Sequence, residues 1–223
     1  MYQLVIECEI KPTSVLFNMN DLDFVKNSLG CINEAFRDFK DSYNTLKFGC
    51  RKPISHWHAC ANRMEEILEE ELGFSCYVNV RKDRSHALYE VTFDGAANVP
   101  EEHIAESELE ITINISPEFY TQQLYIPDET WEQYKEQLTL TFIHELTHSL
   151  QLDDGRKTKY DDYFSNPFEI DAYSSELAFD MFLYNKAEKT CESYARYATI
   201  DNKIQKQMIS LARKKYSYLK NNK

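Results

Sequence analysis

The chain has 223 residues, a formal net charge of −12 and 43% hydrophobic residues, enough to bury one core of domain size. It lacks a charged start followed by an apolar run, and no apolar stretch approaches 18 residues, which argues against a cleaved secretion signal and against a membrane span. The acidic balance argues against nucleic acid as a partner. We therefore expect one cytoplasmic domain over residues 1–223, with no prediction of its oligomeric state.

The first half of the chain predicts a small sheet packed on helices. Apolar residues alternate where strands are expected, and they recur at spacings of three and four where helices are expected. The expected elements are strands at residues 2–10, 76–80, 87–93 and 108–115, helices at 21–48 and 56–72, and a loop at 94–100. The second and third of these strands are expected to form a hairpin around residues 81–85.

Residues 127–154 predict one long amphipathic helix. Pro127 and Asp128 suit its start, and Gly155 suits its end. On a helical wheel, one face is apolar, and the opposite side carries Gln137, Thr141, His144, His148 and Gln151. The core face therefore does not need the histidines, which are free to serve another purpose.

The segment His144-Glu145-Leu146-Thr147-His148 has the spacing of a zinc-hydrolase site. Residues four apart share one face of a helix, so both imidazoles can bind one ion. Glu145 lies about 100° further round, where it can act on a water as a general base but not as a ligand. The motif predicts one Zn²⁺ per chain, bound by His144 and His148.

A catalytic zinc takes a third protein ligand, and three downstream carboxylates compete for that role. We favour Glu169, which opens a second helix after Asn166 and Pro167, although the same position also suits a capping-box glutamate. Asp154 would be carried about 9 Å further along the first helix. Glu176 lies two turns into the second helix and is better placed to brace a histidine.

These motifs resemble the gluzincin group of zinc metallopeptidases over about residues 105–185. The segment from Glu169 to Ala172 is also similar to the Glu-x-x-Ala segment of small bacterial and phage HExxH peptidases. The resemblance implies an α+β zincin-like fold with the substrate cleft beside the first motif helix. It also implies His144, His148 and Glu169 as zinc ligands and Glu145 as the general base.

Two positions depart from the pattern of these families. Many gluzincins carry an aspartate four residues after the ligand glutamate to hold a ligand histidine, whereas this chain has Tyr173. Asp171 or Glu176 would then have to hold the histidine. The repressor-cleaving peptidases usually have glycine at the position of Thr147, so we assign no repressor as substrate. Three tyrosines could stabilise the transition state, namely Tyr160, Tyr163 and Tyr173.

The expected architecture has a sheet-containing lobe with the motif helix at residues 1–155 and a helical lobe with the third ligand at 156–223. Further helices are expected at 188–198 and 201–219. The resemblance to zincin-like peptidases implies that the strand at 108–115 lies along the cleft, where an exposed strand edge can pair with an extended peptide. The site region is acidic, since residues 101–180 hold 19 acidic and four basic residues.

The sequence thus predicts a zinc endopeptidase acting on a polypeptide substrate. The alternative is a zincin-like binding or structural protein, such as a virion-associated phage protein, that keeps the metal without turnover. His56, His58 and Cys60 would fall on different faces of a helix, so we expect no second metal there. The cysteines have no paired spacing and predict reduced thiols; they are residues 8, 31, 50, 60, 76 and 191.

Overall fold

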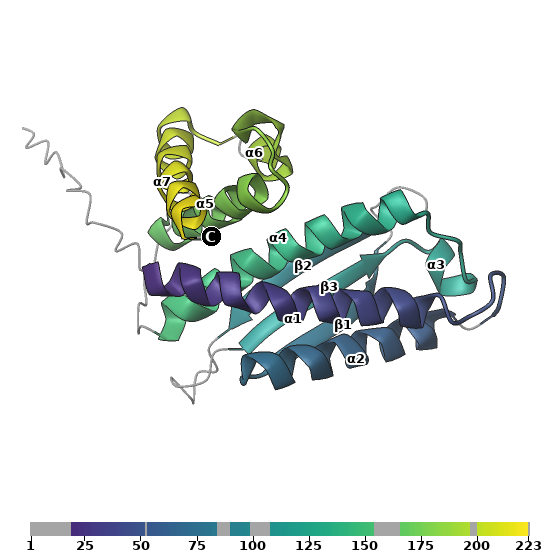
Figure 1. Ribbon diagram of the computed structural model, residues 1–223. Helices are drawn as coiled ribbons and strands as arrows, with labels where there is room; N and C mark the ends of the chain where they lie inside the picture. Colours follow the sequence, from purple (N-terminus) through teal and green to yellow (C-terminus); the bar gives the residue numbers. More distant parts are fainter. Residues whose placement is uncertain are drawn as a thin grey trace, which may run out of the picture.

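The computed structural model describes residues 19–51, 53–83, 90–98, 108–153, 166–196 and 200–222. Over these residues the chain has a mixed α+β fold, as expected from the sequence. Helices α1, α2 and α4 lie on one face of a small sheet, and α5 and α7 lie on the far side of α4 (Figure 1). The strand expected at residues 2–10 lies outside the described residues.

The sheet of the described residues has the order β1-β3-β2. Strand β3 (Glu108–Ile115) lies in the middle, parallel to β1 (Cys76–Lys82) and antiparallel to β2 (Val91–Asn98). The expected hairpin is therefore wrong, because β1 and β2 do not pair. The most regularly apolar strand, β3, takes the centre, where it buries Leu109, Ile111, Ile113 and Ile115 against the helices.

The expected loop at residues 94–100 is also wrong for residues 94–98, because β2 continues through Gly95 and Ala96 to Asn98. Glycine and alanine are poor strand formers, and the sequence therefore indicated a loop. Pairing with β3 overrides that preference, with Gly95 opposite Ile111. The result is an edge strand with small side chains that runs close beside α4.

Helices α1 (Met19–Tyr43) and α2 (Pro53–Leu72) pack against each other; α2 contacts β1, and α1 contacts α4. Helix α1 ends five residues earlier than predicted. The Thr45 hydroxyl donates a hydrogen bond to the carbonyl oxygen of Ser42 and so competes with the backbone hydrogen bonds that would continue the helix. Helix α2 begins three residues earlier than predicted, with Pro53 at a position that suits a first helical turn. The short helix α3 (Glu118–Thr121) follows the sheet.

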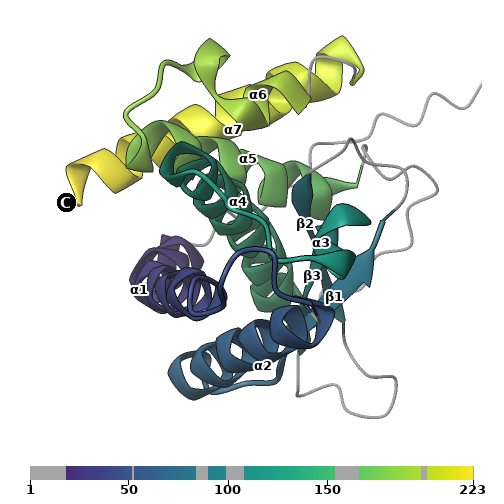
Figure 2. The same ribbon diagram turned by 90° about the vertical axis from the view of Figure 1, so that its right-hand side faces the viewer.

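Helix α4 (Asp128–Asp153) matches the predicted range to within one residue at each end. Its amino-terminal half packs Trp131 into an aromatic cluster with Phe36, Phe39 and Tyr43 of α1. Residues 138–147 are buried on every side, so the polar side of this helix is covered by protein. Figure 2 shows α4 enclosed between α1, the sheet and α5.

Helix α5 (Pro167–Leu183) runs beside α4 and is followed by a 3₁₀ turn (Glu188–Thr190) and α6 (Glu192–Arg196). The last helix, α7 (Asn202–Asn221), packs along α5. These helices share a second apolar cluster made of Ile170, Leu177, Met181, Cys191, Met208 and Ala212. The predicted lobe boundary at residue 155 falls in the segment 154–165, outside the described residues.

No described helix is both long enough and apolar enough to cross a membrane. The five described cysteines, residues 31, 50, 60, 76 and 191, are free thiols. Cys8 lies outside the described residues.

Candidate metal centre

Helix α4 presents His144 and His148 on one face, one turn apart, as the spacing predicts. Their Nε2 atoms lie 3.1 Å from each other, and their ring centroids are 4.8 Å apart. Both nitrogens therefore point at the same small region. This region faces α5 and not bulk solvent, since His144 is only 7% exposed.

Helix α5 supplies the third donor. Asn166 caps the helix by accepting a hydrogen bond of 3.0 Å from the backbone N–H of Phe168, and Pro167 occupies the first turn. This start directs Glu169 toward α4. One carboxylate oxygen of Glu169 lies 3.5 Å from Nε2 of His144, and the other lies 3.4 Å from Nε2 of His148.

The three donors have the spacing that a tetrahedral ion needs. Two ligand atoms on a zinc with bonds of about 2.0–2.1 Å are about 3.3 Å apart. The separations among His144, His148 and Glu169 are 3.1, 3.4 and 3.5 Å. Among the described residues, these three side chains are the one group of histidine, cysteine and carboxylate donors close enough together to hold a metal ion. Two imidazoles and a carboxylate are a ligand set that suits Zn²⁺.

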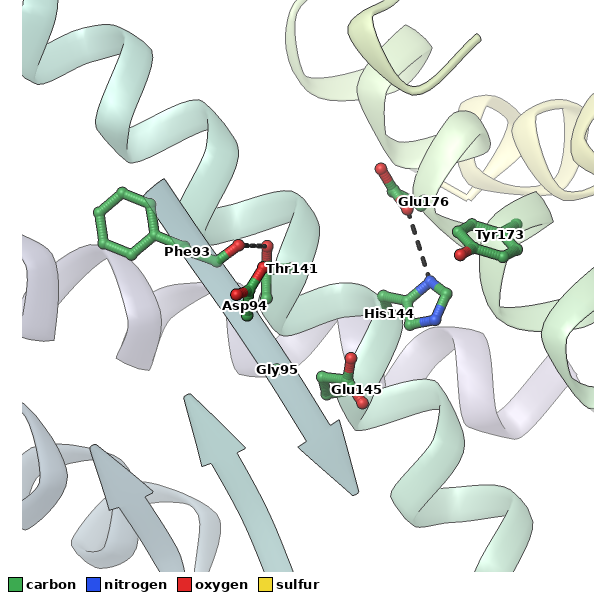
Figure 3. A pocket seen from close by; sticks show the side chains of 8 residues that line it. All are labelled: Phe93, Asp94, Gly95, Thr141, His144, Glu145, Tyr173 and Glu176. Carbon is green, nitrogen blue, oxygen red and sulfur yellow. Dashed lines mark hydrogen bonds and ion pairs between the residues drawn. The ribbon is translucent and has the colours of Figure 1, made fainter. Parts of the chain in front are cut away.

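The other two candidate ligands have different positions. Asp154 lies outside the described residues. Glu176 is 1% exposed, and its Oε2 lies 3.5 Å from Nδ1 of His144, on the side of the ring away from the donor cluster (Figure 3). Glu176 can thus brace His144, the role that an aspartate at the position of Tyr173 would have in many gluzincins.

His148 has its own brace on the neighbouring helix. Its Nδ1 lies 2.9 Å from Oε1 of Gln151, and the amide nitrogen of Gln151 donates to Oδ2 of Asp171 at 3.0 Å. Each histidine is therefore held through Nδ1, which leaves its Nε2 toward the ion position. Glu176 thus lies beside His144, and Asp171 reaches His148 through Gln151.

Charge at the centre favours a cation. Glu145, Glu169 and Glu176 are all less than 10% exposed around the two imidazoles, and burying carboxylates is costly unless positive charge compensates them. Burial by itself would lower the pKa of His144, but Glu169 and Glu176 outweigh this effect and raise the pKa to about 9. The site attracts positive charge, whether a proton or a metal ion.

Glu145 lies next to the donor cluster but outside it. It lines a cleft of about 300 Å³ together with His144, Tyr173 and Gly95 of β2 (Figure 3). Burial raises the pKa of the Glu145 carboxyl above its ordinary value and outweighs the neighbouring His144 and His148, which would lower it. A carboxylate with a raised pKa at the edge of a cleft is suited to accept a proton from water and return it.

Tyr173 is the one of the three predicted tyrosines that lies within the described residues. Its ring centroid is 4.4 Å from that of His144, and it lines the same cleft as Glu145. Tyr160 and Tyr163 lie outside the described residues. A phenol at this position can donate a hydrogen bond to a group in the cleft.

The strand that lines the cleft is not the one expected from the sequence, and two residues of the site, Gly95 and Gln151, were not predicted. Strand β3 is central, and it is β2 that lines the cleft through Phe93, Asp94 and Gly95. Gly95 was assigned to a loop, and no sequence pattern indicated its contact with α4. Gln151 could have been identified as a brace, because it lies three residues after His148 on the same helical side.

His56 and Cys60 form no site with a third ligand within the described chain. His56 and Cys60 were expected on different faces of the helix, which is wrong: they lie one turn apart on one face of α2, with Nε2 of His56 3.9 Å from the sulfur of Cys60. The same Nε2 lies 2.8 Å from the carbonyl oxygen of Ser42, at the end of α1. The structure accounts for His56 as a residue that ties α2 to the end of α1.

No family model matches the chain, and no similar protein was found among curated proteins or solved structures.

Proposed function

We propose that the protein is a zinc-dependent metallopeptidase of the zincin type, with a zincin-like arrangement of its sheet and motif helix. His144, His148 and Glu169 would hold one Zn²⁺, and Glu145 would be the general base. The observation that supports this most strongly is the convergence of three donors at 3.1–3.5 Å beside a buried carboxylate. A coincidental pair of histidines would need neither the third donor nor the two braces.

The residues have distinct parts in the proposed hydrolysis. Zinc, when bound, supplies a Lewis acid that activates water and polarises the scissile carbonyl. Glu145 takes the proton from the attacking water and delivers it to the amine that leaves. Tyr173 donates a hydrogen bond to the carbonyl oxygen as negative charge develops there. Gln151 and Glu176 keep the two imidazoles oriented throughout.

The two edges of the sheet favour a peptide as substrate. The outer edge of β1 is covered by α2, because Glu65 and Glu69 accept hydrogen bonds from the backbone N–H groups of Val78 and Cys76. The outer edge of β2 borders the cleft instead, at Gly95 beside Glu145. An extended peptide can add to such an edge through main-chain hydrogen bonds, which would place its backbone next to the general base.

The cleft is lined by acidic side chains, among them Glu145 and Glu176, and the surrounding sequence is acidic. An acidic cleft raises the local concentration of basic polypeptide and repels nucleic acid. We therefore propose a polypeptide substrate, with basic or unstructured segments preferred.

The first experiment measures zinc per chain by elemental mass spectrometry on protein purified without a metal-affinity column. One zinc per chain is expected, and Glu169→Ala should lose it. Cleavage of a fluorogenic peptide library is then compared between wild type and Glu145→Gln. The variant should keep its zinc and lose cleavage, since only the base is removed.

The outcomes separate the alternatives. Cleavage that survives Glu145→Gln would refute the proposed mechanism. A protein that holds zinc, cleaves nothing and captures a partner equally well with Glu145→Gln would be a zincin-like binding or structural protein. Absence of zinc, not restored by added metal, would refute the metal site itself.

A further inference from the structure

Lys215 is a lysine buried in the apolar face of α7. Its side chain is 2% exposed, and the positions one turn away on the same face are Ala212 and Leu219, both buried. Burying an ammonium group is costly, and an apolar residue would serve a packing role at this position at least as well. The position of this cation therefore calls for a specific explanation.

The ammonium group of Lys215 is held by α5. It donates to the Asp171 carboxylate oxygen Oδ1 at 2.6 Å, to the carbonyl oxygen of Asp171 at 2.8 Å and to the hydroxyl of Ser175 at 2.6 Å. These three contacts fix the Asp171 carboxylate in one orientation. Its second oxygen, Oδ2, then faces α4.

That second oxygen determines which way the amide of Gln151 points. The amide nitrogen donates to Oδ2 of Asp171 at 3.0 Å and lies 3.3 Å from the carbonyl oxygen of Phe168. Both partners accept hydrogen bonds and cannot donate, so the amide nitrogen must face them. The amide oxygen of Gln151 is thereby turned toward His148.

The orientation of the amide selects the tautomer of His148. Because Oε1 of Gln151 can only accept, Nδ1 of His148 must carry the proton of the 2.9 Å hydrogen bond. The lone pair of the neutral ring is then on Nε2, the atom that faces His144 and Glu169. An unprotonated Nε2 with a free lone pair is the form of this atom that can bind a metal ion.

We propose that Lys215 is a positioning residue for the metal ligand His148 and that it acts through the carboxylate of Asp171. The role rests on the metal site proposed above and extends that site to the last helix of the chain. Helix α7 is also tied to α1, since Tyr218 donates to Asp23 at 2.7 Å and Lys26 donates to the carbonyl oxygen of Asn222 at 2.6 Å. Lys215 thus connects the metal ligands to a helix that is anchored on two sides.

The test compares zinc dissociation constants, measured by competition with a chromophoric chelator, for wild type, Lys215→Met and Lys214→Met. Lys214 is exposed on the same helix and is the matched control. Loss of such a supporting contact typically weakens metal binding about 10–100-fold, and that loss is expected for Lys215→Met alone. A merely structural role would lower the stability of the metal-free protein and leave the zinc affinity of the folded protein unchanged, which would overturn the proposal.

Lys215→Met could leave Asp171 as an unpaired buried charge and prevent folding. The double variant D171N/K215M removes both charges, and its zinc affinity should also be about 10–100-fold weaker than that of wild type. Wild-type affinity in this double variant would overturn the proposal.

The wild-type protein allows a test that requires no variant to fold. A long-range ¹H–¹⁵N spectrum of the metal-free form should show the neutral His148 ring protonated at Nδ1, and protonation at Nε2 would overturn the proposal. Failure of the metal site would look different, because wild type would then bind no zinc at all.

Discussion

Gly95 of β2 lies directly against Glu145 of α4. A Cβ atom built on Gly95 would lie 2.3 Å from Cγ of Glu145 and 2.9 Å from its carboxylate carbon, closer than non-bonded atoms can approach. The edge strand can therefore run this close to Glu145 only because residue 95 lacks a side chain. The glycine matters to the site for a steric reason, since a methyl group at residue 95 would displace Glu145.

Gly95→Ala should consequently impair catalysis without removing the metal. A displacement of a reacting group by about 1 Å can cost about 10²-fold, and we expect a loss of that order in kcat/KM. Zinc content should stay at the wild-type value, because the three atoms nearest to the added methyl group all belong to Glu145, which is not one of the proposed ligands. Steady-state kinetics on a fluorogenic peptide, with zinc measured on the same samples, checks this; full activity would show that Glu145 can move aside at no cost.

Gly30→Ala is a matched substitution with the opposite expectation. Gly30 lies in the exposed part of α1, and a Cβ atom there meets nothing within 4 Å. Alanine is favoured over glycine in a helix by about 1 kcal/mol. Urea unfolding should therefore show a more stable protein with unchanged peptidase activity.

The sequence was sufficient to predict the residues whose roles depend on local periodicity. The four-residue spacing of His144 and His148 specifies a shared helical face whatever the tertiary fold. Asn166 and Pro167 likewise specify a helix start, and the structure shows Asn166 as the cap. The range of the motif helix was accurate for the same reason, since its apolar residues repeat over seven turns.

Sheet pairing could not be predicted in this way, because it depends on partners far apart in the chain. Residues 94–98 have the composition of a loop and become a strand only because β3 offers an open edge. The contact of Gly95 with Glu145 and the chain from Lys215 to His148 are likewise products of packing. A lysine on an otherwise apolar helical face was visible in the sequence, but its partner was not.

Glu176→Gln should weaken zinc binding while leaving the protein folded. The carboxylate of Glu176 lies 3.5 Å from Nδ1 of His144, and its negative charge contributes to the raised pKa of that imidazole. Removing such a brace typically costs about 10–100-fold in metal affinity. Competition with a chelator measures this, with Glu132→Gln on the exposed surface of α4 as control. Equal affinities in the two variants would show that Glu176 does not hold His144.

Tyr173→Phe separates a transition-state role from a packing role. The ring contact with His144 is kept in phenylalanine, and only the hydroxyl is lost. If the phenol stabilises the developing oxyanion, kcat should fall by about 10²–10³-fold while zinc affinity is unchanged. Tyr125→Phe, at a tyrosine that is 67% exposed, should leave kcat unchanged. A kcat of Tyr173→Phe equal to that of wild type would assign the oxyanion contact to another residue.

The buried thiols predict that the protein loses stability at alkaline pH. Burial raises the pKa of Cys31 to about 11 and that of Cys60, Cys76 and Cys191 to about 12, against 9.0 for an unfolded thiol. Above pH 9 the unfolded chain releases protons that the folded chain retains, so stability is fully present below pH 9 and falls as pH rises.

Each buried thiol can contribute a slope of up to about 1.4 kcal/mol per pH unit between pH 9 and 10, a window below the ordinary tyrosine pKa. Urea unfolding across this window measures the slope. Cys76→Ala should lower the stability at pH 8, because it leaves a small cavity, but it should flatten the pH dependence, because one titrating group is gone. A slope as steep as that of wild type would mean that Cys76 already ionises in the folded protein.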